Sequence, residues 1–68
     1  MDEETFNQSI RKFLRTVGVK SQQEIEQAIA KASASGAIAG TETFPATMTL
    51  QVAGLQLEIK FDGEIRLQ

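Results

Sequence analysis

Apolar residues near the start of the chain recur at helical spacing. They are Phe6, Ile10, Phe13, Leu14 and Val17. Steps of three and four residues between them trace one stripe along a helix. Acidic residues precede this stripe and basic residues close it, which suits the helix dipole. Gly18 follows the last apolar residue and is placed to end the helix in the left-handed conformation. The pattern predicts a first helix over residues 4–17.

A second apolar stripe follows after a short polar stretch. Ser21 is a good N-cap, and Glu24 three residues later completes a capping box. The inward positions of this stripe are Ile25, Ala28, Ile29 and Ala32. Gly36 is placed to close the segment. We expect a second helix over residues 22–35, followed by a connection over residues 36–46.

The remaining apolar residues alternate with polar ones, which is typical of strands with one buried face. The alternation predicts three strands, over residues 47–52, 55–60 and 64–67. A two-residue loop at Ala53 and Gly54 keeps all apolar residues of the first pair on one face. Because alanine fits a type I′ turn poorly, a four-residue loop of the same parity is an open alternative.

The second predicted turn needs an odd number of residues to keep the faces in phase. A three-residue loop over 61–63, with Gly63 in a bulge, satisfies this requirement. It would pair Ile59 with Ile65 and place Lys60 opposite Glu64, an attractive cross-strand pair.

These elements predict a single α+β domain over residues 1–68. Two N-terminal helices would pack on one face of a three-stranded antiparallel β-meander, in the order α-α-β-β-β. With only 68 residues, such a domain buries a small core and has a small net stability.

Composition removes several functional classes. The chain has no Cys and no His, so disulfides, thiolates and the commonest general base and metal ligand are absent. A net charge of −2 argues against general nucleic-acid binding. The acidic start is unlike a secretory signal, and no apolar run approaches the roughly 20 residues of a membrane span. We therefore expect a cytoplasmic protein with no membrane contact.

The stretch "VGVKSQQEIEQ" resembles the helix-turn-helix of phage repressors, in which "QQ" opens the recognition helix. That motif needs apolar residues about six and nine positions after its glycine, where this chain has Glu24 and Gln27. The apolar Ile25 and Ala28 come one residue later, which rotates the second helix by about 100°. A nucleic-acid-binding regulator stays as the alternative function. It would use the basic residues Arg11, Lys12, Arg15 and Lys20.

An enzyme is not expected, because no acid–base pair can be placed in an apolar pocket. Glu58, Asp62 and Glu64 could bind Mg²⁺ or Ca²⁺, but a solvated face with cationic partners explains them better. No catalytic, cofactor-binding or metal-binding residue is assigned, and no cofactor is expected.

The first predicted strand, "ATMTLQV", is uncharged and β-prone, which favours strand addition or dimer formation at its edge unless residues 37–40 cover it. Phe61, expected in a loop, and an alanine ridge on the second helix could also contact a partner. The candidate interface residues are Thr47, Thr49, Gln51, Phe61, Ala30 and Ala34. The expected function is a small protein-interaction module whose partner is an unidentified protein or a second copy in a homodimer.

Three segments of the chain are "TFNQSIRKFL", "VGVKSQQEIEQAIAKA" and "GTETFPATMTLQVAGLQLEIKFDGEI". Together they resemble a family of short, uncharacterised bacterial proteins classed as a domain of unknown function. The resemblance covers nearly the whole chain. It implies a free-standing single-domain protein and carries no activity, cofactor or catalytic residue.

Overall fold

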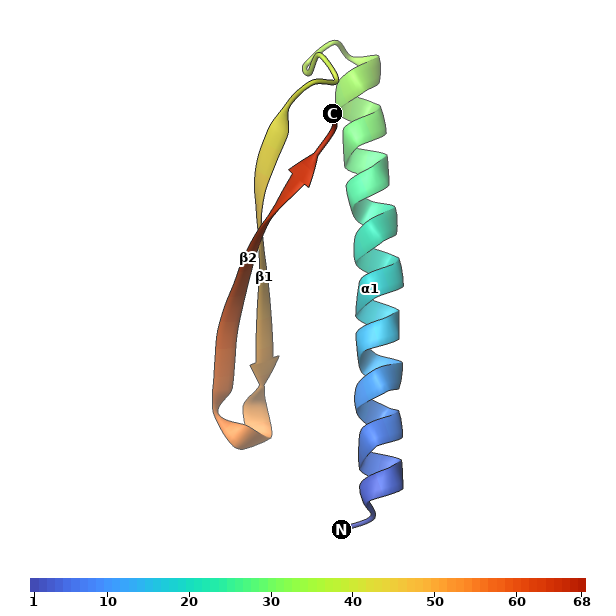
Figure 1. Ribbon diagram of the computed structural model, residues 1–68, viewed down its shortest axis with the longest axis vertical. Coiled ribbons are helices and arrows are strands. Elements are labelled where there is room, and N and C mark those ends of the chain that lie inside the picture. Colours follow the sequence, from blue (N-terminus) through green and yellow to red (C-terminus); the bar gives the residue numbers. More distant parts are fainter. The chain divides into compact units, whose positions relative to one another are not determined.

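The computed structural model describes residues 1–68 and contains one helix and one hairpin (Figure 1). Helix α1 spans Glu3–Ala34, strand β1 spans Thr43–Val52, and strand β2 spans Leu57–Arg66. A short 3₁₀ turn, η1 (Ala53–Leu55), joins the strands. The chain divides into two compact units, Met1–Ala37 and Ile38–Gln68, which are described separately below. The order α-β-β replaces the predicted α-α-β-β-β.

The predicted break between two helices is wrong, because α1 runs without interruption for 32 residues. Gly18 and Ser21 both lie inside it rather than at a C-cap and an N-cap. No proline occurs in this stretch, and an interior glycine costs only about 1 kcal/mol relative to alanine. The two predicted stripes also join in phase, since Val17, Ser21 and Ile25 follow one another at steps of four. Nothing in the local sequence therefore stops the helix.

Both ends of α1 are capped by their own side chains and backbone. The Asp2 carboxylate accepts the backbone N–H groups of Glu4 at 3.0 Å and Thr5 at 3.2 Å, together with the Thr5 hydroxyl at 2.8 Å. At the other end, Gly36 has φ +77°, and Ala37 N–H donates to the Ala32 carbonyl at 2.9 Å. This is a Schellman motif, which satisfies the last carbonyls of the helix. The prediction that Gly36 closes the helical segment is confirmed.

The strands pair as a two-stranded antiparallel sheet along their full lengths. Val52 lies opposite Leu57, so the four-residue turn over residues 53–56 is confirmed over the two-residue one. Gln56 takes the left-handed position of this turn, at φ 53°. The turn preserves parity, and all pairs back to Phe44 and Ile65 therefore stay in phase.

The predicted third strand is wrong, because β2 continues straight through residues 61–63. The expected pairs, Ile59 with Ile65 and Lys60 with Glu64, do not form. Residues 63–66 instead pair with residues 43–46, which were predicted to belong to the connection. A straight strand keeps every ladder bond, whereas the predicted bulge would leave one residue unpaired.

The connection between α1 and β1 is organised by one carboxylate. Glu42 accepts the backbone N–H groups of Ala39 at 2.8 Å, Gly40 at 2.9 Å and Thr41 at 3.1 Å. Gly40 has φ +95°, a conformation that favours glycine. Since the N–H groups of residues 39 and 40 bind Glu42, they do not pair with the edge of β1.

Candidate functional site

The hairpin has one wholly apolar face. Residues at even positions of β1 and odd positions of β2 share this face, because opposite residues in the register point the same way. Its central pairs are Met48 with Phe61 and Leu50 with Ile59. The remaining members are Phe44, Ala46, Val52, Leu57, Gly63 and Ile65. We call these ten positions the sheet apolar face.

The helix carries a matching stripe on one side. We call it the helix apolar stripe, and its members are Phe6, Ile10, Phe13, Leu14, Val17, Ile25, Ala28, Ile29 and Ala32. Its positions recur every 11 residues, as in Phe6, Val17 and Ala28. A period of 11 is close to the natural repeat of the helix, so the stripe runs nearly straight along it. A left-handed coiled coil would need a seven-residue repeat instead.

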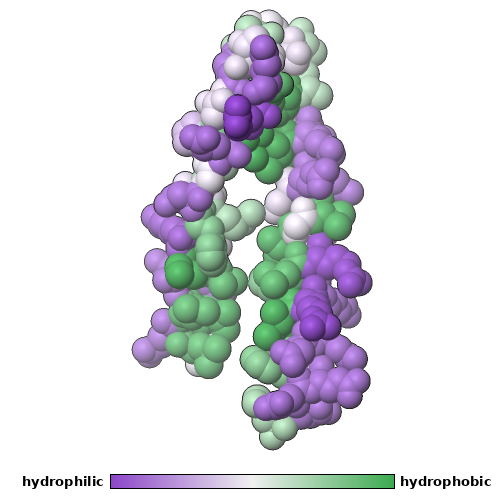
Figure 2. All heavy atoms as spheres, in the orientation of Figure 1, coloured by the Kyte–Doolittle hydropathy of each residue, from purple (hydrophilic) through white to green (hydrophobic).

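Neither unit buries a residue within itself. Phe13 is 51% exposed on the helix, and Phe61 is 53% exposed on the hairpin. Figure 2 shows apolar residues gathered along one side of each unit and polar residues along another. Contiguous exposed apolar surface is common at protein–protein contacts and in ligand-binding grooves.

The outer edge of β1 is a second exposed feature. Leu67 N–H donates to the Glu42 carbonyl, which fixes the phase of the ladder between the strands. In that phase, even-numbered residues of β1 turn their backbone groups toward β2, and odd-numbered residues turn theirs outward. Pro45 is odd, so its missing N–H costs the ladder nothing. Proline is tolerated in sheets at such edge positions.

The structure places three predicted interface residues, Thr47, Thr49 and Gln51, at this outer edge, with side chains on the polar face. Thr47 Oγ1 donates to Asp62 Oδ1 at 2.9 Å, and Gln51 Nε2 donates to Glu58 Oε1 at 2.6 Å. Cross-strand hydrogen bonds thus hold two of the three side chains and leave the backbone edge free.

The prediction that Phe61 lies in a loop is wrong. Phe61 lies in the middle of β2, opposite Met48. It therefore belongs to the sheet apolar face. Ala30 and Ala34 are exposed on α1, about 160° and 120° around the helix from Ile10. They lie away from the helix apolar stripe, and they belong to a different unit from the other predicted interface residues.

The four basic residues proposed for nucleic-acid contact do not form one surface. At 100° per residue, Arg15 lies about 40° from Arg11, while Lys20 lies on the opposite side of the helix. Arg15 and Lys20 line a shallow hollow of about 310 Å³ with Thr16 and Val19. The helix-turn-helix interpretation of residues 17–27 is wrong, because the turn does not exist.

The acidic side chains of the hairpin do not form a cluster of three. Asp62 and Glu58 accept hydrogen bonds from β1, and no three acidic side chains gather in the way that a metal ion requires. Two carboxyls, Asp2 and Glu42, accept hydrogen bonds that lower their pKa. The Thr5 hydroxyl, with nearby N–H groups, lowers the pKa of Asp2, and the Ala39 N–H does the same for the pKa of Glu42.

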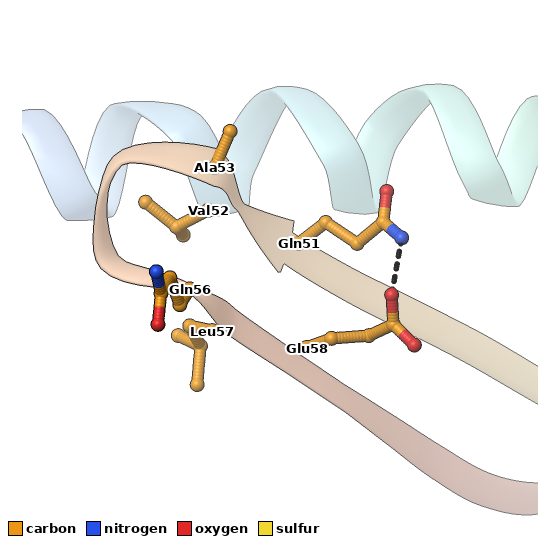
Figure 3. A pocket seen from close by; sticks show the side chains of 6 residues that line it. All are labelled: Gln51, Val52, Ala53, Gln56, Leu57 and Glu58. Carbon is orange, nitrogen blue, oxygen red and sulfur yellow. Dashed lines mark hydrogen bonds between the residues drawn. The ribbon is translucent and has the colours of Figure 1, made fainter.

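A hollow of about 340 Å³ lies at the turn of the hairpin (Figure 3). It is lined by residues 51–53 and 56–58, with the hydrogen bond from Gln51 to Glu58 at one side. Its walls are aliphatic side chains, the amides of Gln51 and Gln56, and the carboxylate of Glu58. Glu58 is the one titratable side chain that lines the hollow.

Sequence reasoning missed Glu42 and the continuity of the sheet apolar face. Glu42 carries no local signal, since its three N–H donors depend on the path of the connection. The sheet apolar face did have a signal. Alternation continues from Ile59 through Phe61 and Gly63 to Ile65, provided that "DG" is not treated as a turn.

Comparison with protein-family models matches residues 1–68 to one family, described as a family of unknown function (DUF6494). Comparison with curated proteins and with solved structures found no significant match. No helix of the chain has the length and apolar character that a membrane span requires.

Proposed function

The chain belongs to a family of unknown function (DUF6494), and on that premise we propose that it is a small protein-interaction module. One observation carries the proposal: the chain has two amphipathic elements and not one buried residue. The sheet apolar face and the helix apolar stripe would be buried against another protein chain. The absence of cysteine supports a cytoplasmic location for such a module.

The energetics of each element favour association. An isolated two-stranded hairpin is marginally stable at best in water, and most helical stability comes from tertiary packing. Each 100 Å² of apolar surface removed from water contributes about 2.5 kcal/mol. Small scaffolds gain stability from disulfides, metals or association, and this chain has no cysteine. Association with a protein is the route that its surfaces support.

A matched pair of substitutions on α1 tests the proposal. Phe13 lies on the helix apolar stripe and is 51% exposed, whereas Val19 lies opposite Ile10 and is 52% exposed. We expect Phe13→Glu to weaken association at least tenfold, because a charge would have to be buried. Val19→Glu should change it less than twofold. Sedimentation velocity from micromolar to millimolar concentration measures self-association, and capture by the immobilised chain measures binding to other proteins.

A protein that stays monomeric to millimolar concentration and retains no other protein in a Phe13-dependent way would contradict the proposal. Nuclease treatment and a salt series during capture separate protein from nucleic-acid partners. Captured material that is lost on nuclease treatment and binds much more weakly at higher salt would instead support nucleic-acid binding by the basic residues of α1.

A further inference from the structure

We propose that the partner is a second copy of this chain, bound edge to edge through β1 so that two hairpins form one four-stranded sheet. The inference rests on the proposed function and names the occupant of the exposed surfaces. The strand order would be β2-β1-β1-β2, with a two-fold axis between the two β1 strands. Such an interface uses the same surface on both copies.

The two edges of the hairpin differ sharply in charge. Residues of β2 with outward backbone groups are Glu58, Lys60, Asp62, Glu64 and Arg66, and every one is charged. Residues of β1 with outward backbone groups are Thr43, Pro45, Thr47, Thr49 and Gln51, and none is charged. Charged side chains protect an edge strand from pairing, so only the β1 edge is open. Two β1 edges can meet without charge repulsion, and growth beyond two copies is blocked.

Pro45 selects the register. Outward residues are odd-numbered, so a two-fold axis at Thr49 pairs Thr49 with Thr49 of the second copy, and Thr47 with its Gln51. Both copies of Pro45 then fall outside the ladder, opposite the turn residue Ala53. An axis one step nearer to Pro45 would leave a carbonyl of Gln51 facing a residue with no N–H. The Thr49 register therefore gives the longest ladder that leaves Pro45 outside, and it pairs the outward donors of Thr47, Thr49 and Gln51.

This register also aligns the apolar surfaces. It places Met48 opposite Leu50 of the second copy, so both sheet apolar faces lie on the same side. The four-stranded sheet then has one continuous apolar face.

Single cysteines test the register, because the chain has no cysteine of its own. The Cα atoms of Thr49 and its symmetry mate would lie about 5.5 Å apart, within the range that a disulfide spans. Thr47 would lie about 14 Å from Thr47 of the second copy. With oxidised glutathione, Thr49→Cys should form a covalent dimer at least tenfold faster than Thr47→Cys or Gln51→Cys. An equal mixture of Thr47→Cys and Gln51→Cys should give the mixed dimer.

Lys60→Cys is the matched control, since Lys60 lies directly opposite Thr49 but on the β2 edge. Equal cross-linking of Lys60→Cys and Thr49→Cys would overturn the proposed edge. Retained self-association without the Thr49 cross-link would overturn this register and leave the proposed function standing. A monomer that captures a different protein would overturn the second copy as partner. A monomer that captures nothing would overturn both proposals.

Discussion

The Glu42 carboxylate accepts three consecutive backbone N–H groups of the connection before β1. Hydrogen bonds to the charged form favour that form, so the pKa of this carboxyl lies below its usual range, mainly because of the Ala39 N–H. The same residue accepts Leu67 N–H through its backbone carbonyl. One side chain and one carbonyl of Glu42 therefore join the start and the end of the hairpin unit.

The lowered pKa of Glu42 gives stability a pH dependence of defined sign. Its contribution is present above the ordinary glutamic acid pKa of about 4.3 and is lost as pH falls through the lower pKa of the folded state. We expect Glu42→Gln to be less stable than the parent near neutral pH and to converge with it in acid. Urea midpoints between pH 3 and 7, at fixed protein concentration, measure this difference.

Glu24 provides the control for this series, because its side chain accepts no hydrogen bond in the structure and lies on α1. Glu24→Gln should keep the acid slope of the parent protein. If Glu42→Gln also kept that slope, the contacts of Glu42 with the connection would not contribute to stability.

At the scale of elements, the continuity of α1 decides the fold. A turn at residues 18–21 would have required Gly18 in the left-handed region, yet only Gly36 and Gly40 have positive φ among the glycines. The helix instead carries an interior glycine with no atom within 4 Å of the position that a Cβ would occupy. Replacing Gly18 by alanine therefore distinguishes a continuous helix from one broken at this position.

We expect Gly18→Ala to stabilise the protein by about 0.5–1 kcal/mol, because alanine loses less backbone entropy in a helix. Gly36→Ala should destabilise it by about 1 kcal/mol, because Gly36 has φ +77°. Thermal unfolding followed by circular dichroism at 222 nm measures both. A loss of stability in Gly18→Ala would indicate a turn at that position.

Local rules predicted some of these elements well. The Schellman glycine at position 36 and the alternation from Met48 to Ile59 both follow from short-range sequence. The break at Gly18 and the turn at Asp62-Gly63 did not form, because glycine permits a turn without requiring one. Whether a helix continues through glycine depends on the phase of the stripes on both sides. Both errors came from treating a permissive residue as a stop.

The candidate interface was also predictable only where short-range sequence determines it. The uncharged character of β1 is visible in the sequence, and it identified Thr47, Thr49 and Gln51 as edge residues. Phe61 was misplaced because the register of β2 depends on pairing with residues 43–46, which are about 20 positions away. Its role on the sheet apolar face needs that long-range partner.

At the scale of the whole molecule, folding and association should be one transition. In the proposed dimer, the apolar surfaces leave water only on association. For a two-state dimer of this length, each tenfold rise in protein concentration should raise Tm by roughly 5 °C. Scanning calorimetry over a hundredfold range of concentration measures this shift. A Tm that does not change with concentration would contradict coupled folding and association.

The absence of buried side chains also bears on the lifetime of the chain in a cell. Proteases cleave unfolded backbone, and a lone copy without buried side chains has little hydrophobic stabilisation to keep it folded. A copy in a complex is shielded, so its degradation slows as its partner becomes available. The steady-state amount would then rise more steeply than the rate of synthesis. Abundance itself would report whether the partner is present.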